Sequence, residues 1–294
     1  MASLSQIRTK ISSVKGTRRI MSAMKLISAV KLKRSQDLLM ANRPYSDAYQ
    51  ETTHNIAKRC DPESHPLLRK VEDPKKLHIV FLTSDRGLCG SFNSHLIRKL
   101  ETYLLTETKG YEEVIFSFLG RRGRDHFSKR KLRVSESYTG INEKSLAEIA
   151  SSVALELSEE FIKGEIDEVI LVYNYFKSAL TQVMTYERIL PIEPPKGGEE
   201  DSSLIDYLYE PTQKEVLDKV IPKYIEARVQ RAIQESLTSE HAARMTAMES
   251  ATSNADDVIK NLTLIFNKTR QAMITTELMD IVNGTEALRK GGDE

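Results

Sequence analysis

The chain has 294 residues, of which 40% are hydrophobic and 29% charged, and a formal net charge of +1. This composition suits a soluble protein with a real core and a large polar surface. Its two cysteines, Cys60 and Cys89, have neither a C-x-x-C nor a zinc-like spacing, and no apolar run reaches the roughly 18 residues that a membrane span needs. A disulfide scaffold and a membrane-spanning segment are therefore excluded.

The first 43 residues predict a long basic helix. Gly16 is the only helix breaker before Pro44, and ten Lys or Arg residues stand against one acid, Asp37. Apolar residues recur at spacings of three and four, which places them on one narrow helix face. They are Leu4, Ile7, Ile11, Val14, Met21, Met24 and Ile27. The strong positive charge implies an acidic partner.

The same stretch is rich in serine and poor in acids, which is also the composition of an organellar transit peptide. The alternative is an ordinary helix of the mature protein. We favour the second interpretation, because the helical pattern continues past Asp37 without a cleavage-like break. Residues 1–60 are thus interpreted as an N-terminal helix.

Strand and helix patterns alternate through the middle of the chain. Apolar strand patterns occupy 77–82, 114–120, 167–176 and 180–190, the last expected to lie antiparallel to the third. Helical patterns occupy 92–104 and 143–163, and a short basic helix follows residue 120. This alternation predicts a Rossmann-like α/β domain over residues 75–205, with helices on the faces of its sheet.

The C-terminal part, interpreted as a helix over residues 212–288, has no Gly or Pro between Pro222 and Gly284. A helix of that length would reach roughly 90 Å, far beyond an average helix of about 11–12 residues. A heptad seam can be followed along it: Met245, Met248, Thr252, Ala255, Ile259, Leu262, Phe266, Thr269, Met273 and Thr276. Its small and polar members make it weak for a permanent dimer and better suited to packing on one other helix.

The predicted fold class is therefore α/β, with a long antiparallel two-helix coiled coil formed by the N- and C-terminal helices and the α/β domain inserted between them. The returning helix is the longer one, so its end should protrude alone. That end includes the apolar stretch 270–284, which then has no partner helix.

The loop "TSDRGLCG" (83–90) lies after a strand and before a helix, where α/β proteins bind phosphates. It matches neither the G-x-G-x-x-G nor the Walker pattern. A structural turn or a protein contact is favoured over a nucleotide site.

The stretch 121–133 has seven basic residues and could neutralise phosphates, so a basic coiled-coil nucleic-acid-binding protein is the alternative function. Phe127 is the only aromatic residue among these basic residues. We therefore favour a charged surface in contact with solvent over a nucleic-acid-binding site. Residues 223–283 carry seven basic and eight acidic side chains, which speaks against phosphate binding along both helices.

No motif for catalysis or metal binding is present. The six histidines are scattered without H-E-x-x-H spacing, and no G-x-S-x-G elbow occurs. We expect no catalytic residue, no metal and no cofactor, and hence a mechanical or regulatory protein.

Several stretches together resemble the gamma subunit of F-type ATP synthase, of bacterial type. They are "IRTKISSVKGTRRIMSAMKLISAVKLKRSQ" near the N-terminus, "TSDRGLCGSFN", "DYLYEP" (206–211) and "EHAARMTAMESATSNADDVI" (240–259). A terminal pattern is met by Ile274, Thr275, Glu277, Asp280 and Gly284, with Thr285 in place of the family's alanine. The resemblance covers nearly the whole chain.

The resemblance implies a non-catalytic central rotor stalk, present in one copy per complex. Its partners would be three alpha and three beta subunits, an epsilon subunit and a membrane c ring. Ion flow through the c ring would drive rotation inside the alpha/beta ring and so ATP synthesis at the beta subunits. No plastid-type cysteine segment is visible, so the expected location is the cytoplasmic face of a bacterial inner membrane, as a peripheral protein.

The resemblance also implies partner-contact residues. Contacts to the alpha/beta ring would involve Met24, Lys25, Arg270, Gln271, Thr275 and Glu277. Contacts to epsilon would involve Asp85, Arg86, Gly87, Leu88 and Cys89, and contacts to the c ring Tyr207, Tyr209 and Glu210. Two intramolecular alternatives stay open, namely that Met24 packs on the C-terminal helix and that Arg270 pairs with Glu277.

Overall fold

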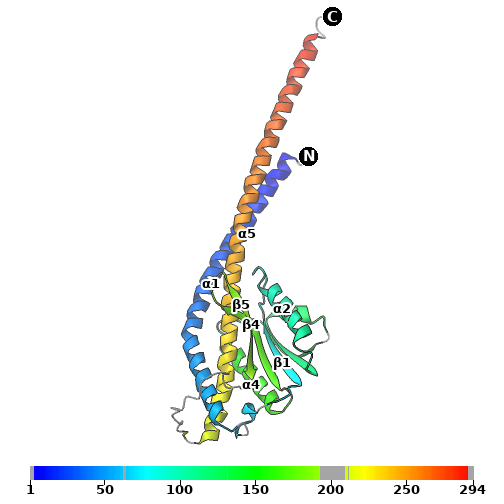
Figure 1. Ribbon diagram of the computed structural model, residues 1–294. Coiled ribbons are helices and arrows are strands. Elements are labelled where there is room, and N and C mark those ends of the chain that lie inside the picture. The colour runs from blue at the N-terminus through cyan, green and yellow to red at the C-terminus, as the bar shows by residue number, and fades with distance from the viewer. Residues whose placement is uncertain are drawn as a thin grey trace. The chain divides into compact units, whose positions relative to one another are not determined.

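The computed structural model describes residues 3–61, 64–69, 71–130, 132–192, 209–210 and 212–290. It divides into two compact units, Ser28–Thr246 and Met1–Ile27 with Ala247–Glu294, which are described separately. Two helices contribute to both units, α1 (Leu4–Arg59) and α5 (Gln213–Lys290) (Figure 1). The predicted fold class is confirmed, since an α/β domain is inserted between two long helices.

The α/β part of the larger unit contains a five-stranded sheet in the order β3-β2-β1-β4-β5. The strands are β1 (Lys76–Leu82), β2 (Glu113–Leu119), β3 (Arg133–Tyr138), β4 (Glu168–Phe176) and β5 (Gln182–Leu190). The first four strands are parallel. Strand β5 is antiparallel to β4, and this antiparallel pairing was expected from the sequence. The helices between strands are α2 (Phe92–Thr106), α3 (Arg121–Phe127) and α4 (Leu146–Ile162), and a 3-10 turn, η2, spans Pro66–Leu68.

Strand β3 was not predicted, so the expectation of four strands is corrected to five. Its sequence, RVSESY, has no apolar run, and its side chains are exposed or half-buried. It lies at the edge of the sheet, and no described strand pairs with its outer side. An edge strand needs no continuous apolar pattern, because little of it is buried.

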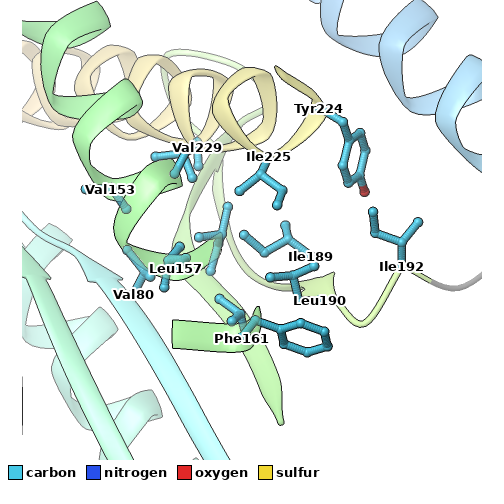
Figure 2. Close-up of a cluster of buried hydrophobic side chains, with 14 of the residues drawn as sticks. Val80, Val153, Leu157, Phe161, Ile189, Leu190, Ile192, Tyr224, Ile225 and Val229 are labelled. Carbon is cyan, nitrogen blue, oxygen red and sulfur yellow. The ribbon is translucent and has the colours of Figure 1, made fainter. Parts of the chain in front are cut away.

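The sheet packs helices on both faces, and β1 shows the alternation that makes this possible. Leu77, Ile79 and Phe81 join the apolar cluster that includes residues of α2 and α3. Val80 and Leu82 point to the other face, where they meet α4 and the first half of α5. Figure 2 shows this second cluster, in which side chains from the sheet, α4 and α5 converge.

Within the larger unit, α1 and α5 pack antiparallel. Arg43 of α1 pairs with Glu235 of α5, and Asp47 of α1 pairs with Arg231 of α5. The second pair lies four residues later on α1 and four residues earlier on α5, as antiparallel helices require. The two helices run side by side here (Figure 1).

The smaller unit is an antiparallel pair of helix ends. Arg18 pairs with Asp256 at 2.6 Å, and Lys25 pairs with Glu249 at 2.6 Å. On α5 the heptad seam is confirmed, because its members are buried or half-buried from Met248 to Thr269 and mostly flanked by exposed neighbours.

The predicted face of α1 is correct up to Met24 but wrong at Ile27. Ile27 is 58% exposed, and the buried position is Ser28, at 3%. The seam keeps a 3.5-residue period, and a small polar side chain meets the packing requirement at that position. The pattern of apolar residues alone therefore could not predict that Ser28 is the buried position.

Candidate functional site

The C-terminal end of α5 is exposed in the smaller unit, where none of the described residues covers it. Every side chain from Arg270 to Thr285 is exposed, whereas the seam is half-buried up to Thr269. The α5 helix continues past the N-terminal end of α1 at this point (Figure 1). Six large apolar side chains on this segment are between 45% and 63% exposed: Met273, Ile274, Leu278, Met279, Ile281 and Val282. Contiguous exposed apolar surface of this kind marks an interaction site.

The predicted ring-contact residues Arg270, Gln271, Thr275 and Glu277 all lie on this exposed end. Thr275 Oγ1 donates to the Gln271 carbonyl at 2.9 Å, so the hydroxyl is engaged within the helix. Among the described residues, Arg270 and Glu277 form no ion pair with each other, so the intramolecular alternative for Arg270 is wrong. Their charged groups face solvent and are available to another chain.

Met24 and Lys25 lie on α1 in the same unit. Met24 is half-buried, and the Lys25 ammonium is paired with Glu249. The side chains of this pair are 37% and 60% exposed, and exposed ion pairs contribute little to stability. An acidic partner could therefore compete for Lys25 at small cost.

The loop after β1 is held in place by many hydrogen bonds. Ser84 Oγ donates to the Arg86 carbonyl at 2.7 Å, and the Ser84 amide donates to Asn93 Oδ1 at 3.0 Å. From α5, the Arg244 guanidinium donates to the Gly87 carbonyl at 3.3 Å. The loop is thus tied both to α2 and to α5 within the larger unit.

The Asp85 carboxylate accepts hydrogen bonds from two backbone amides at the carboxyl edge of the sheet. Its Oδ1 accepts from the Arg121 amide at 2.9 Å, at the first residue of α3, and its Oδ2 accepts from the Gly140 amide at 2.7 Å. These backbone donors are the groups that bind anions at the carboxyl edge of parallel sheets. Because they already bind a carboxylate, the geometry favours a structural loop over a nucleotide site.

Gly120, which follows β2, shows how closely the neighbouring segments approach this loop. Its φ is +111°, and a Cβ there would lie 2.1 Å from the Thr83 carbonyl oxygen. Only glycine fits this position.

Only part of the predicted epsilon-contact loop faces solvent. Arg86 and Leu88 are exposed, whereas Cys89 is buried and Asp85 is engaged in the hydrogen bonds above. Burial raises the pKa of the Cys89 thiol, which keeps it protonated and unreactive. Leu88 is 62% exposed and has a φ of 62°, so the loop presents an apolar side chain in a strained conformation.

The predicted c-ring contacts are only partly described. Tyr207 lies outside the described residues. The Tyr209 hydroxyl lies 3.8 Å from Cys60 Sγ, and Glu210 is exposed. Gln213 Nε2 donates to the same sulfur at 2.9 Å, so this segment is attached to the end of α1.

Three of the seven basic residues in the run at 121–133 pair with acids. Arg124 pairs with Asp125, and Arg130 pairs with Glu101. Arg133 pairs with Glu113 at 2.6 Å. This pairing reduces the positive potential that phosphate tracking requires.

Neither a metal site nor a membrane span is found in the described ranges. There, no three or more His, Cys, Asp or Glu side chains are arranged to hold a metal ion. No helix in the same part of the chain combines the length and apolar character needed to cross a bilayer.

The sequence did not reveal a group of charged residues between the two helices and the sheet, here called the helix–sheet cluster. Its members come from α1, α5 and β5: Arg43, Asp47, Arg228, Arg231, Glu235 and Glu187. Glu235 is fully buried, and its partner Arg43 lies 192 residues away in the chain. No local pattern links residues that far apart, although a charged residue within an apolar helix face is a weak signal.

Comparisons with known proteins agree over nearly the whole chain. A family model described as "ATP synthase" matches residues 3–288. The ATP synthase gamma chain of Anaeromyxobacter sp. (strain Fw109-5) is 43% identical over 293 residues, covering 98% of this chain and 100% of that one. The ATP synthase gamma chain of Chlorobium phaeobacteroides (strain BS1) is 42% identical over 294 residues, covering 98% and 99%.

Solved structures share the fold. A chain of the Euglena gracilis mitochondrial ATP synthase (OSCP/F1/c-ring, rotational state 3) aligns with a TM-score of 0.67 at 20% identity, covering 99% of this chain and 96% of that chain. A chain of the rotor of the same synthase in rotational state 1 aligns with a TM-score of 0.61 at 18% identity, covering 92% and 98%.

Proposed function

The chain belongs to the family of ATP synthase gamma chains, and from this premise we propose that it couples ion flow to ATP synthesis by rotating inside a ring of alpha and beta subunits. It is a non-catalytic central-stalk subunit. Rotation would be driven by ions passing through a membrane c ring, and the chemistry would take place on the beta subunits.

The exposed end of α5 is the observation that carries this proposal. A helix that buries nothing between Arg270 and Thr285 gains no stability from tertiary packing there, although it displays six large apolar side chains. At about 100° per residue, these six side chains span roughly 240° of the helix circumference, which is wider than the single apolar stripe of about 100° that packs on one neighbour. A surface of this kind fits an enclosing sleeve better than a single partner helix. Three alpha and three beta subunits would supply that sleeve.

The ring contacts would involve residues in two places on the smaller unit. Arg270, Gln271, Thr275 and Glu277 would meet the ring interior near the C-terminal end. Met24 and Lys25 would meet acidic loops of beta, with the exchange of Glu249 for a beta carboxylate costing Lys25 little. A contact that held one angular position too tightly would oppose rotation, because it would favour a single state.

The contacts to epsilon and the c ring would lie on the larger unit. The loop Asp85–Cys89 would meet epsilon through its two exposed side chains, Arg86 and Leu88, while Asp85, Gly87 and Cys89 maintain its shape. Tyr207, Tyr209 and Glu210 would lie near the c ring.

These contacts would give the parts of the chain different roles. Residues 1–60 and 212–288 would form the shaft, and residues 75–205 the α/β head. One copy would serve each complex. The complex would lie on the cytoplasmic face of a bacterial inner membrane, with this chain as a peripheral subunit.

The proposal is tested by ending the chain after Thr269 and assembling it with alpha, beta, epsilon and the c ring in inverted membrane vesicles. The expected result is a lower yield of ions pumped per ATP hydrolysed, because the missing segment guides the shaft. The urea midpoint of the α/β head should stay the same, since none of the described side chains after Thr269 belongs to an apolar core cluster.

A matched variant keeps the length of the helix and changes Met273, Ile274, Leu278 and Met279 to Gln. It should reproduce the loss of coupling if the apolar surface is what matters. The isolated full-length chain should show no ATPase activity. If the full-length chain neither joined the alpha/beta ring nor changed its ATPase rate, the rotor proposal would be wrong.

A further inference from the structure

We propose that the buried Arg43–Glu235 pair is a positioning joint that fixes the sheet to both long helices, so that torque passes between them with little twist. This inference rests on the proposed rotor function. All the residues concerned lie in the larger unit, Ser28–Thr246.

Glu235 of α5 holds the end of β4 and α1 at the same time. Its Oε2 accepts from the backbone amide of Phe176, the last residue of β4, at 2.9 Å. Its Oε1 accepts from Arg43 Nη2 at 2.9 Å and from Arg43 Nε at 3.1 Å. The carboxylate is fully buried, so its hydrogen bonds are not exchanged with water.

Arg43 of α1 completes the joint from the opposite side. Its Nη2 also donates to the Phe176 carbonyl oxygen at 3.1 Å, and its guanidinium lies 5.1 Å from the ring centroid of Tyr175. Both backbone groups of Phe176 are therefore held by side chains, one from each long helix. A planar guanidinium can make this set of contacts, whereas an ammonium is a single point charge.

Neighbouring residues of the helix–sheet cluster extend the same connection. Arg231 of α5 pairs with Asp47 of α1, and Arg228 pairs with Glu187 of β5. Ser239 Oγ donates to the Asn174 carbonyl oxygen of β4 at 3.1 Å. The cluster contains three arginines and three carboxylates, so it is neutral as a whole.

The directional character of these bonds is what suits them to resist twist. Apolar contacts are non-directional and allow side chains to slide, whereas a hydrogen-bonded buried pair favours one geometry. The smaller unit offers a contrast, because its ion pairs Arg18–Asp256 and Lys25–Glu249 are exposed. Exposed pairs are screened and weak.

The test uses the assembled complex with its ring fixed to a surface and a probe on the α/β head. The probe is attached at Glu107→Cys, an exposed position after α2, and both native cysteines are buried. Two variants weaken the joint, Arg43→Lys and Glu235→Gln. The matched control is Lys33→Gln, which breaks the exposed Lys33–Asp37 pair on the same helix.

The quantity measured is the width of the probe's angular fluctuations while the motor waits for ATP. The angular variances of elastic parts connected in series add. If the substitutions make the joint as flexible as the rest of the rotor, the total angular variance of the probe should be about twofold larger in both variants than in the parent. The control should match the parent. An unchanged variance in Arg43→Lys and Glu235→Gln overturns the joint, and so does an equal increase in Lys33→Gln.

A second measurement applies to the full-length chain before assembly, in case a variant does not join the ring. In Glu235→Gln the Phe176 amide loses its charged acceptor, so this amide should exchange about tenfold faster or more. Unchanged exchange at Phe176 overturns the joint. If the parent chain joins no ring or its probe does not rotate, the rotor proposal is what fails, whatever the exchange data give for the joint.

Discussion

At the scale of single residues, a chain of polar side chains crosses the interior between the sheet and α4. His78 Nδ1 lies 2.7 Å from Glu160 Oε2, and Ser135 Oγ lies 2.8 Å from Glu160 and 2.7 Å from Glu156. One hydroxyl donates one hydrogen, so the second short contact of Ser135 needs a proton from a carboxyl group. Burial raises the pKa of Glu156. For Glu160, burial is the largest single effect and also raises the pKa, but the hydrogen bonds from His78 and Ser135 together with the charges of His78 and Arg133 outweigh it, so the pKa of Glu160 is lowered. As pH rises, Glu156 therefore keeps its proton longer than Glu160 does.

This assignment predicts a pH dependence for Glu156→Gln. The folded pKa of Glu156 is above the unfolded value of about 4.3, so the folded state binds more protons between the two values. The contribution of Glu156 is fully present below the unfolded pKa and is lost as pH rises through the folded pKa. Glutamine does not ionise, so the stability of the variant relative to the parent should be higher at neutral pH than near pH 4. Urea unfolding of the full chain at both pH values measures this.

The control is Glu159→Gln, an exposed position on the same helix. The stability of Glu159→Gln relative to the parent should change less between the two pH values than that of Glu156→Gln. A Glu156→Gln variant whose relative stability is the same at both pH values would show that folding does not raise the pKa of Glu156.

At the scale of elements, the long helices were predictable because their signal is local and repeated. The seam from Met248 to Thr269 follows from spacing alone, and so does the exposed end that comes after it. The edge strand β3 lacks such a signal, because its side chains are mostly in water. The Arg43–Glu235 pair lacks one too, since it depends on how β4 ends against both helices. Periodicity thus predicts elements and their buried faces, but it does not pair charges across the chain.

The seam itself can be tested with Ala255→Leu. Ala255 is 7% exposed, next to the Asp256 that pairs with Arg18 of α1. Adding bulk to a well-packed site typically costs about 1–3 kcal/mol, so amides of 247–269 should exchange faster in the variant. Ala272→Leu is the control, because Ala272 is exposed on the same helix and leucine is nearly as good a helix former. Equal exchange in the two variants would mean that the helix ends do not pack along this seam.

At the scale of the whole molecule, the two units differ sharply in how much apolar surface they bury. The large core clusters belong to the unit Ser28–Thr246. Among the described residues of the other unit, only Ile7, Met248 and Ala255 are buried apolar side chains. Helices gain most of their stability from tertiary packing, so this unit is stable only to a small degree by itself. A partner that surrounds it would supply the missing contacts.

This difference predicts where assembly will change hydrogen exchange. In the free chain, amides of 270–285 should exchange fastest among the helical residues, because nothing packs on them and the helix frays from its end. Assembly with the alpha and beta subunits should slow them by at least about tenfold, since fraying then requires breaking contacts with the ring. The β1 peptide, 76–82, is the internal control and should exchange equally slowly in both states, because it lies in the centre of the sheet. Protection that appeared on the α/β unit while 270–285 still exchanged freely would place the ring on a different surface.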